Sequence, residues 1–302
     1  RKKAKDNLMI LSIGEILADF IGEDETKFRM CCGGAPFNVA VNAKHAGAKV
    51  GFIGRVGKDP VGNYLKKYAS KENLDLCKIQ TDEVRNTTLA FVTLQNGERN
   101  FGFFRHDTAD FHIDISSPVF ENLGKADIVH LGSLMLSEEK GCLFAQKIVE
   151  KVHQAGKLLS FDVNFRSDLY SDFEEAKNIY LPYIEKADIL KFSEDELELF
   201  TGEKDIEKGA ERLNKKSGLL LITMGGKGSY YQLGKLRGFV ETVSVKPVDT
   251  TGAGDAFYGT ALAGLDGKKL EKLSEEELKN ILSQANIAGA AATQHKGALA
   301  SR

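Results

Sequence analysis

Short, continuous runs of apolar residues recur along the chain, and most end at a glycine or a polar residue. Such runs are typical of strands that are buried on both faces of a parallel sheet. They lie at residues 8–13, 50–54, 128–132, 158–163, 189–192 and 219–223. The segments between them predict helices over residues 36–46, 60–73, 138–155, 172–185, 194–201 and 205–217. This alternation predicts an α/β fold in which helices sandwich a mostly parallel sheet.

Two segments interrupt the alternation. Residues 16–32 are too many for an ordinary loop between a strand and a helix. Within residues 86–108, two β-prone runs flank Asn96-Gly97, the strongest short signal of a hairpin. We expect the two insertions to pair as a small β-sheet lid beside the main sheet. The alternative is a hairpin at the edge of the main sheet.

The last third of the chain has a different pattern. Residues 227–243 predict a hairpin that turns at Gly234-Lys235, and a strand is expected to end near Val248. Helices are expected over residues 255–265, 274–282 and 283–294. We expect the whole chain, residues 1–302, to form a single domain.

Charge and cysteine content narrow the class of function. The 302 residues carry 41 basic and 43 acidic side chains, a net charge of −2, which is no electrostatic footprint for nucleic acid or an anionic membrane. No apolar run reaches the roughly 20 residues of a membrane span. The cysteines form neither a CxxC pair nor a zinc spacing, and free thiols predict a cytoplasmic protein. They are Cys31, Cys32, Cys77 and Cys142.

The segment Asp249–Phe257 places a glycine-rich turn before a helix. Free N–H groups at a helix start form an anion site that suits phosphate. A carboxylate at Asp255 would repel that phosphate, unless it acts as a base on a hydroxyl that attacks the phosphorus. The alternative is an aspartate that only caps the helix. Known phosphate fingerprints do not fit, because Gly228 separates Lys227 from Ser229 and no GxGxxG follows the first strand.

A second glycine-rich segment, Gly33-Gly34-Ala35-Pro36-Phe37-Asn38, opens the first predicted helix. Paired glycines expose the backbone, and proline suits a first helical position. The Asn38 side chain would lie about one turn into the helix. It would either hydrogen-bond a neutral polyol or simply cap the helix or face solvent.

These motifs together resemble a known family. Residues 33–38 and the run Gly54–Gly62 look like the N-terminal signature of the ribokinase-like (PfkB) sugar kinases, and Asp249–Phe257 resembles their C-terminal signature. Gly14–Phe20 and Asp162–Arg166 look most like the fructokinase and 2-keto-3-deoxygluconate kinase branches. The resemblance implies ATP-dependent phosphorylation of a sugar hydroxyl, with fructose giving fructose 6-phosphate as the expected reaction.

Three alternatives stay open at this point. The acid sugar 2-keto-3-deoxygluconate would need an extra cation near Arg105. A ribokinase usually has Gly-Gly-Lys-Gly where this chain has Gly33-Gly34-Ala35-Pro36. A non-catalytic sugar or nucleotide sensor on the same fold would not need an intact Asp255.

The resemblance also implies a role for each matching residue. Asp255 would be the general base, next to an anion hole made of Gly252, Ala253 and Gly254. The sugar-binding positions would be Asp19, Gly33, Gly34, Asn38, Arg105 and Arg166. The nucleotide-binding positions would be Asn164, Ser193, Thr223, Gly225, Gly228 and Asn286. Serine at 193 departs from the family's usual asparagine, which leaves its role open.

Cations and partners follow from the same resemblance. Glu196 would organise water bound to Mg²⁺, and Asp249 and Thr251 would hold a potassium ion through backbone oxygens. ATP and a small sugar are the expected ligands, with no nucleic acid and no membrane. The exposed β face of the lid would also allow a homodimer.

Overall fold

The computed structural model describes residues 10–22, 26–95, 98–116, 118–213 and 218–299. Its larger sheet contains β1 (Ile10–Ile13), β4 (Val50–Gly57), β5 (Leu76–Asp82), β8 (Ile128–Leu131), β9 (Leu158–Asp162), β10 (Ile189–Ser193), β11 (Leu219–Thr223), β12 (Ser229–Leu233) and β13 (Leu236–Val240). Within the described residues, this sheet has nine strands in the order β13-β12-β11-β10-β9-β8-β1-β4-β5. Only β12 and β13 pair antiparallel to their neighbours. The predicted mostly parallel sheet is confirmed.

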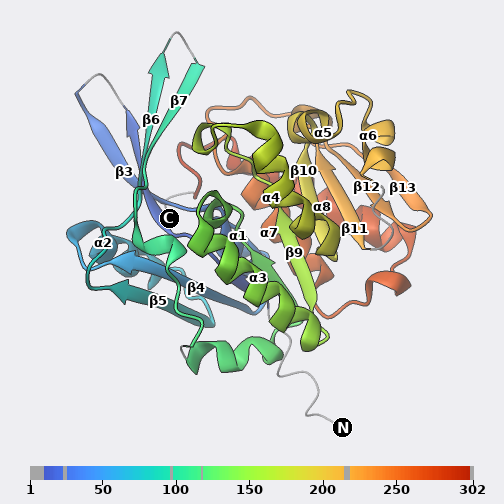
Figure 1. The fold of residues 1–302 in the computed structure, drawn as a ribbon. Coiled ribbons are helices and arrows are strands. Elements are labelled where there is room, and N and C mark those ends of the chain that lie inside the picture. Colours follow the sequence, from blue (N-terminus) through green and yellow to red (C-terminus); the bar gives the residue numbers. More distant parts are fainter. Residues whose placement is uncertain (1–9, 23–25, 96–97, 117, 214–217, 300–302) are drawn as a thin grey trace.

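Helices cover both faces of this sheet (Figure 1). They are α1 (Ala35–His45), α2 (Pro60–Ala69), α3 (Glu139–Gln154), α4 (Phe173–Lys186), α5 (Glu194–Thr201), α6 (Ile206–Arg212), α7 (Ala253–Leu265) and α8 (Glu275–Ala292). Alternate residues of β1 enter two separate cores, because successive side chains of a strand point to opposite faces. Ile10 packs with α1, α2, α7 and α8. Leu11 and Ile13 pack with α3, α4, α5 and α6.

A smaller sheet stands beside the larger one (Figure 1). It contains β2 (Leu17–Gly22), β3 (Phe28–Gly33), β6 (Leu89–Gln95) and β7 (Glu98–Phe104), in the order β3-β2-β6-β7. β2 pairs with β6 in parallel, and the two outer pairs are antiparallel. The prediction that both insertions join in one small sheet is confirmed, and the alternative of a hairpin on the main sheet is wrong. The expected Asn96-Gly97 turn lies outside the described residues.

Three other expectations differ from the structure. The two helices predicted over 274–294 are one helix, α8, because Ser283 continues the helix without a glycine or proline to break it. No strand ends at Val248 in the described chain, because the N–H groups of Val248 and Asp249 both donate to the carbonyl of Thr293. Strand β5 was not predicted, because it is an edge strand whose apolar residues are only half-buried. Residues 8–9 and 214–217 of two predicted elements lie outside the described chain.

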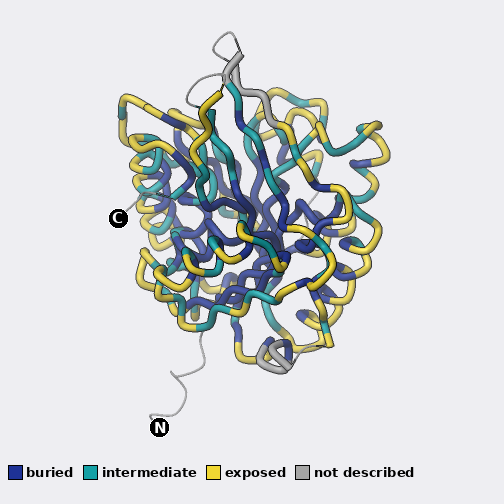
Figure 2. Tube along the Cα trace, turned by 90° about the vertical axis from the view of Figure 1, so that its left-hand side faces the viewer, coloured by how far each residue is buried: buried dark blue, intermediate teal, exposed yellow. Residues whose placement is uncertain are grey.

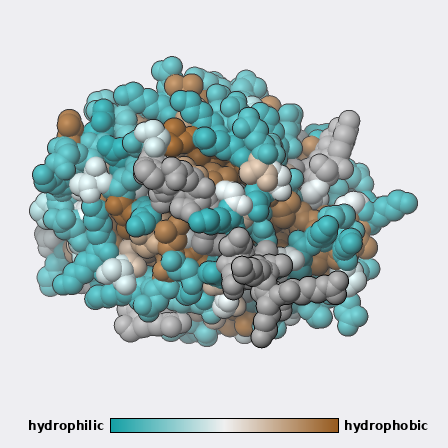
Figure 3. All heavy atoms as spheres, turned by 90° about the horizontal axis from the view of Figure 1, so that it is seen from below, coloured by the Kyte–Doolittle hydropathy of each residue, from teal (hydrophilic) through white to brown (hydrophobic). Residues whose placement is uncertain are grey.

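Burial is concentrated along the large sheet, and the exposed residues lie mainly on the outer helices and loops (Figure 2). The face seen from below is mostly hydrophilic, with apolar residues in small separate patches (Figure 3). In the part of the chain that the structure describes, no helix is long and apolar enough to cross a membrane. The hairpin predicted over 227–243 is confirmed as β12 and β13, which turn at Gly234-Lys235.

Candidate active site

Two adjoining cavities open at the carboxyl ends of the parallel strands, where open α/β sheets bind their ligands. The larger has a volume of about 450 Å³ and the smaller of about 320 Å³. Both are lined by Thr223, Thr250 and Gly254, so they meet at the amino end of α7. The two glycine-rich segments singled out in the sequence are thereby brought to one place.

The turn before α7 depends on Gly252. This residue has a φ of 78°, in the left-handed region, and an added Cβ would lie 2.5 Å from the carbonyl oxygen of Ala298. Only glycine fits such a position without strain. The turn delivers Ala253 and Gly254 as the first residues of the helix, where N–H groups lack acceptors within the helix. This geometry suits the predicted anion hole.

Asp255 lies one residue further along α7 and faces α1. Its Oδ2 accepts a hydrogen bond of 2.8 Å from Nδ2 of Asn38. Burial raises the pKa of Asp255, although the bond from Asn38 and the charges of Lys191 and Arg166 oppose the rise. Oδ1 of Asn38 is buried and has no hydrogen-bond partner among the described residues. The pair therefore offers a base and a spare acceptor side by side.

Two more buried carboxyl groups line the larger cavity, and both have a pKa of about 7. Burial and then the charge of Asp255 raise the pKa of Asp19. Burial is also the main cause of the raised pKa of Glu15. Its Oε1 accepts a 3.2 Å hydrogen bond from the N–H of Ala35. Oε2 of Glu15 is buried without a partner in the described part of the molecule. Sequence reasoning found Asp19 but missed Glu15.

The pKa of Glu15 leads to a stability prediction. A carboxyl group whose pKa is raised on folding stabilises the protein fully below its unfolded pKa of 4.5, and this stabilisation is lost as pH rises towards 7. A Glu15→Gln variant cannot ionise. Its free energy of unfolding, relative to wild type, should therefore increase by on the order of 3 kcal/mol between acidic and mildly alkaline pH.

Urea unfolding of both proteins at pH 5 and pH 8 measures this change. Glu150→Gln, at an exposed position of α3, is the control and should show a constant difference. If the difference in the free energy of unfolding between Glu15→Gln and wild type were also the same at both pH values, ionisation of Glu15 would not destabilise the folded protein.

The paired glycines before α1 are required by close packing. A Cβ at Gly33 would overlap the carboxylate of Asp19. Gly34 has a φ of 106°, and a Cβ there would lie 2.5 Å from the carbonyl oxygen of Glu15. The glycines thus let β3 and α1 approach the two acidic residues. Gly34 itself lines the cavity, whereas Gly33 acts by making room.

Residues that follow β9 and β10 form the opposite wall of the larger cavity. Asn164 and Ser193 were expected at the nucleotide, Arg166 at the sugar and Glu196 at Mg²⁺, and all four line this cavity. The structure adds an ion pair of Asp162 and Lys191, which sequence reasoning did not identify as functional. The available signal was a lysine within the otherwise apolar run 189–192. A charged residue in a buried strand needs a partner and often marks a site.

The smaller cavity contains the predicted nucleotide loop. Thr223, Gly225 and Gly228 line it after β11, and Asn286 lines it from α8. Nδ2 of Asn286 donates to the carbonyls of Val240 and Glu241, at 2.9 and 3.3 Å. Asn286 therefore fixes the cavity wall that follows β13. This arrangement brings the predicted nucleotide residues 223, 225, 228 and 286 together.

The residues expected at cation sites are tied to nearby backbone. Oε1 and Oε2 of Glu196 accept bonds from the N–H groups of Phe165 and Ser193, both 2.8 Å long. The two carboxylate oxygens of Asp249 accept bonds from the N–H groups of Thr251 and Gly297, at 2.8 and 2.9 Å. Among the described residues, no group of three or more acidic, histidine or cysteine side chains is placed to hold a metal ion.

Arg105, expected to contact the sugar, is bonded to buried groups of the protein. It is buried, its Nε and Nη2 donate to one oxygen of Asp110 at 3.0 and 2.7 Å, and its Nη1 donates to Ser137. The guanidinium also lies over the ring of Phe111. Arg105 does not line either cavity. Asp110, five residues further along the chain, holds the arginine at the base of the small sheet, and the charge of Arg105 still acts on Glu15 in the cavity wall.

This pairing predicts a structural effect. Arg105→Met should lower the free energy of unfolding by about 3–5 kcal/mol, because it leaves the buried carboxylate of Asp110 without its cation. The double variant Arg105→Met/Asp110→Leu should recover most of that loss. Urea unfolding of the two variants measures both effects, and a single variant as stable as wild type would contradict the structural assignment.

Comparison with known proteins matches this geometry. The family described as "pfkB family carbohydrate kinase" matches residues 7–302. A probable fructokinase-2 of Arabidopsis thaliana is 36% identical, over 96% of this chain and 92% of its own length. A probable fructokinase-3 of the same plant is 38% identical, over 96% of this chain and 87% of its own length.

Solved structures show the same likeness. A fructokinase of Vibrio cholerae O395 in a form bound to fructose, ADP and calcium has a TM-score of 0.85 and 29% identity, and the match covers 97% of this chain and 94% of that one. A fructokinase of Xylella fastidiosa with bound ATP has a TM-score of 0.85 and 28% identity, over 96% and 93% of the two chains. With both signatures meeting at one cavity and a family match along nearly its whole length, the chain belongs to the pfkB family of carbohydrate kinases, enzymes that phosphorylate a sugar hydroxyl.

Proposed function

We propose that this enzyme transfers the γ-phosphoryl group of ATP to fructose, giving fructose 6-phosphate. The observation that carries the choice of sugar is the acidic wall formed by Asp19 and Glu15 in the larger cavity. Hydroxyl groups of a neutral sugar would donate to these carboxyl oxygens, whereas the carboxylate of 2-keto-3-deoxygluconate would meet like charge. An acid sugar would need an extra cation near Arg105, and Arg105 itself is held by Asp110.

The mechanism follows from the positions of Asp255 and Asn38. Asn38 donates to Oδ2 of Asp255, which orients the carboxylate and leaves Oδ1 to accept a proton from the sugar hydroxyl. The sugar oxygen then attacks the γ-phosphorus, and the bond from that phosphorus to ADP breaks. N–H groups at the amino end of α7 stabilise the charge on the transferred group. The raised pKa of Asp255 makes it a stronger base than an ordinary aspartate.

We expect each cavity to bind a different ligand. The smaller, apolar-walled cavity between Gly225 and α8 would take the adenine and ribose, and the larger would take the sugar. The phosphates would then lie at Gly254, where the cavities meet. Asn164 and Ser193, which line the larger cavity beside Thr223, would contact the phosphates from the β9 and β10 side.

Mg²⁺ fits this arrangement. Each oxygen of Glu196 accepts one N–H, which leaves lone pairs directed to other donors, such as water on a metal ion. When bound to the phosphates, Mg²⁺ would neutralise part of their charge. A potassium ion would be held by backbone oxygens of residues 249–251, a loop that Asp249 ties to Gly297.

A panel of sugars tests the substrate. ADP release should give a kcat/KM for fructose at least about tenfold above that for 2-keto-3-deoxygluconate, ribose or glucose, because wrong sugars lose or misplace contacts to Asp19 and Glu15. The ³¹P spectrum of the product should show a phosphate at position 6. Preference for the acid sugar would overturn the choice of fructose, and no ADP release with any sugar would favour a non-catalytic sensor.

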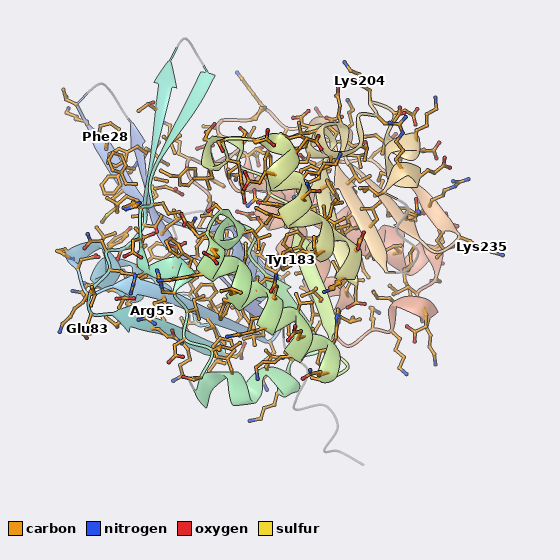
Figure 4. The ribbon with its side chains drawn as sticks, viewed as in Figure 1. Phe28, Arg55, Glu83, Tyr183, Lys204 and Lys235 are labelled. Atoms are coloured by element: carbon orange, nitrogen blue, oxygen red, sulfur yellow. The ribbon has the colours of Figure 1, made fainter. Side chains whose placement is uncertain are left out.

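We further propose that the small sheet is a lid over the sugar and that its outer face forms a homodimer. Asp19 and Phe103 line the larger cavity from the inner face of the sheet. The outer face carries an aromatic cluster in which Phe28 and Phe104 meet the ring of Phe91 edge-on, at 5.3 and 5.2 Å. Phe104 is 65% exposed, and Phe28 lies on the outer side of the sheet (Figure 4). A second copy would bury this apolar surface.

Sedimentation velocity tests the dimer. Wild type should sediment as a dimer at micromolar concentration, and Phe104→Asp should sediment as a monomer because it places a charge in the interface. Leu143→Asp, at an exposed position of α3, is the control and should remain dimeric. A monomeric wild type would contradict the proposal.

We also propose a cytoplasmic location, because the four free cysteines are typical of proteins in reducing compartments.

A further inference from the structure

A buried lysine faces the point where the two cavities meet. Lys191 lies within β10, between the fully buried Leu190 and Phe192, and only 5% of its surface is exposed. Burial alone would lower its pKa, but the carboxylates of Asp162, Glu196 and Asp255 outweigh burial and raise it. The side chain therefore carries a full positive charge inside the protein.

Asp162 holds this ammonium group in place. The two residues are direct neighbours on adjacent parallel strands, and Nζ lies 2.9 Å from each carboxylate oxygen. An ammonium group has three protons to donate. Among the described residues, its hydrogen bonds go to Asp162 alone, so one proton is left for another acceptor.

The position of Nζ points to that acceptor. An added Cβ at Gly254 would lie 3.5 Å from Nζ and 3.7 Å from Cε of Lys191, so the ammonium lies against the first turn of α7. The amino end of a helix is already positive, and a second positive charge there is unfavourable unless an anion binds between them. Lys191 also lines the larger cavity together with Asp255 and Gly252.

We propose that Lys191 is a catalytic residue that donates a hydrogen bond to the transferred phosphoryl group. This inference rests on the proposed phosphoryl transfer. A bond forms between the sugar oxygen and the γ-phosphorus, and the bond from that phosphorus to the bridging oxygen breaks, with its electron pair going to ADP. The hydroxyl proton goes to Asp255. Lys191 stays protonated throughout and, with the N–H groups of α7, stabilises charge on the oxygens of the group in transit.

A purely structural ion pair is the competing explanation, and it makes a different prediction. A structural pair would affect ADP and ATP binding alike, whereas a contact to the γ-phosphate affects ATP alone. The test therefore compares the affinities of ADP and of the non-hydrolysable β,γ-imido analogue of ATP by titration calorimetry. Steady-state ADP release with fructose gives kcat for the same proteins.

Lys191→Met keeps the length of the side chain and removes its charge. It should weaken binding of the ATP analogue by about tenfold to a hundredfold, because it loses a charge-assisted hydrogen bond, and leave ADP affinity within about twofold. It should lower kcat by roughly a hundredfold or more. Lys157→Met is the matched control, because Lys157, just before β9, pairs with Asp127, just before β8, at the amino ends of the parallel strands, with 3.3 Å between Nζ and Oδ1. Lys157→Met should leave both nucleotide affinities and kcat unchanged.

Two outcomes overturn the proposal: equal losses of ADP and analogue affinity, or a kcat that stays within about threefold of wild type. If Lys191→Met does not fold because Asp162 is left unpaired, Lys191→Met/Asp162→Leu removes that charge and permits the same binding comparison. A wild type that phosphorylates no sugar would refute the proposed function, while the two nucleotide affinities would still decide whether Lys191 contacts the γ-phosphate.

Discussion

Replacing Asp255 by asparagine should lower kcat by roughly 10³-fold or more, with the fold and ATP binding retained. General-base catalysis alone accounts for roughly 10²–10⁴-fold. The asparagine is isosteric, and its carbonyl oxygen can still accept the hydrogen bond from Asn38. Thermal stability should not fall, because burial raises the pKa of Asp255 and so opposes its ionisation in the folded protein.

Single-turnover kinetics with saturating ATP and fructose measure this loss. Asp266→Asn, the same substitution at the other end of α7, is the control and should keep nearly full activity. Asp255→Asn activity above a tenth of wild type would mean that another group takes the proton.

Gly254→Val should have the second large effect, a loss of kcat/KM of roughly 10²-fold or more with a nearly unchanged thermal transition. Strain in the turn is not involved, because the backbone of Gly254 is outside the left-handed region and a Cβ there would be in ordinary contact with Lys191. The valine would instead occupy the space between the helix start and Nζ of Lys191, where the phosphoryl oxygens are proposed to bind.

Gly252→Ala provides the contrast within the same turn. Its φ of 78° and the 2.5 Å approach to Ala298 make any side chain strained. We expect a loss of stability of about 1–3 kcal/mol or more, seen as a lower melting temperature. Thermal unfolding and kinetics of the two variants therefore separate space for the phosphoryl group from folding of the turn. If Gly254→Val unfolded as easily as Gly252→Ala, the glycine at 254 would be needed for the fold and not for the ligand.

Local patterns predicted the elements well where both faces of a strand are buried. The runs that became β1, β8 and β11 are mostly apolar and almost completely buried, so the sequence pattern and the burial agree. Strand β5 lies at the sheet edge with one face half-exposed, and its mixed sequence shows no such run. The expected strand at Val248 has β-prone residues, but the backbone there bonds to Thr293, far away in the chain.

The site could be predicted only as far as its motifs are contiguous. Asp255 and Gly254 lie within one segment with its own chemistry, and Asn38 lies in another. The role of Lys191 depends on Asp162 in the neighbouring strand, a pairing that no local pattern contains. Arg105 was difficult to place for a different reason. Its partner Asp110 lies only five residues away, but the direction in which the arginine side chain points depends on how the chain folds at the base of the small sheet.

The hydrogen bond between Asn38 and Asp255 joins residues 217 positions apart. The sugar-binding half of the centre therefore has no partner until Asp255 has left the ribosome and α7 has docked against α1. Closing so long a loop is costly in entropy and is expected late in folding. Catalytic activity during refolding should consequently appear with the final cooperative step, after most of the helical signal has returned. A nascent kinase would thus be unable to consume ATP before α7 has emerged from the ribosome.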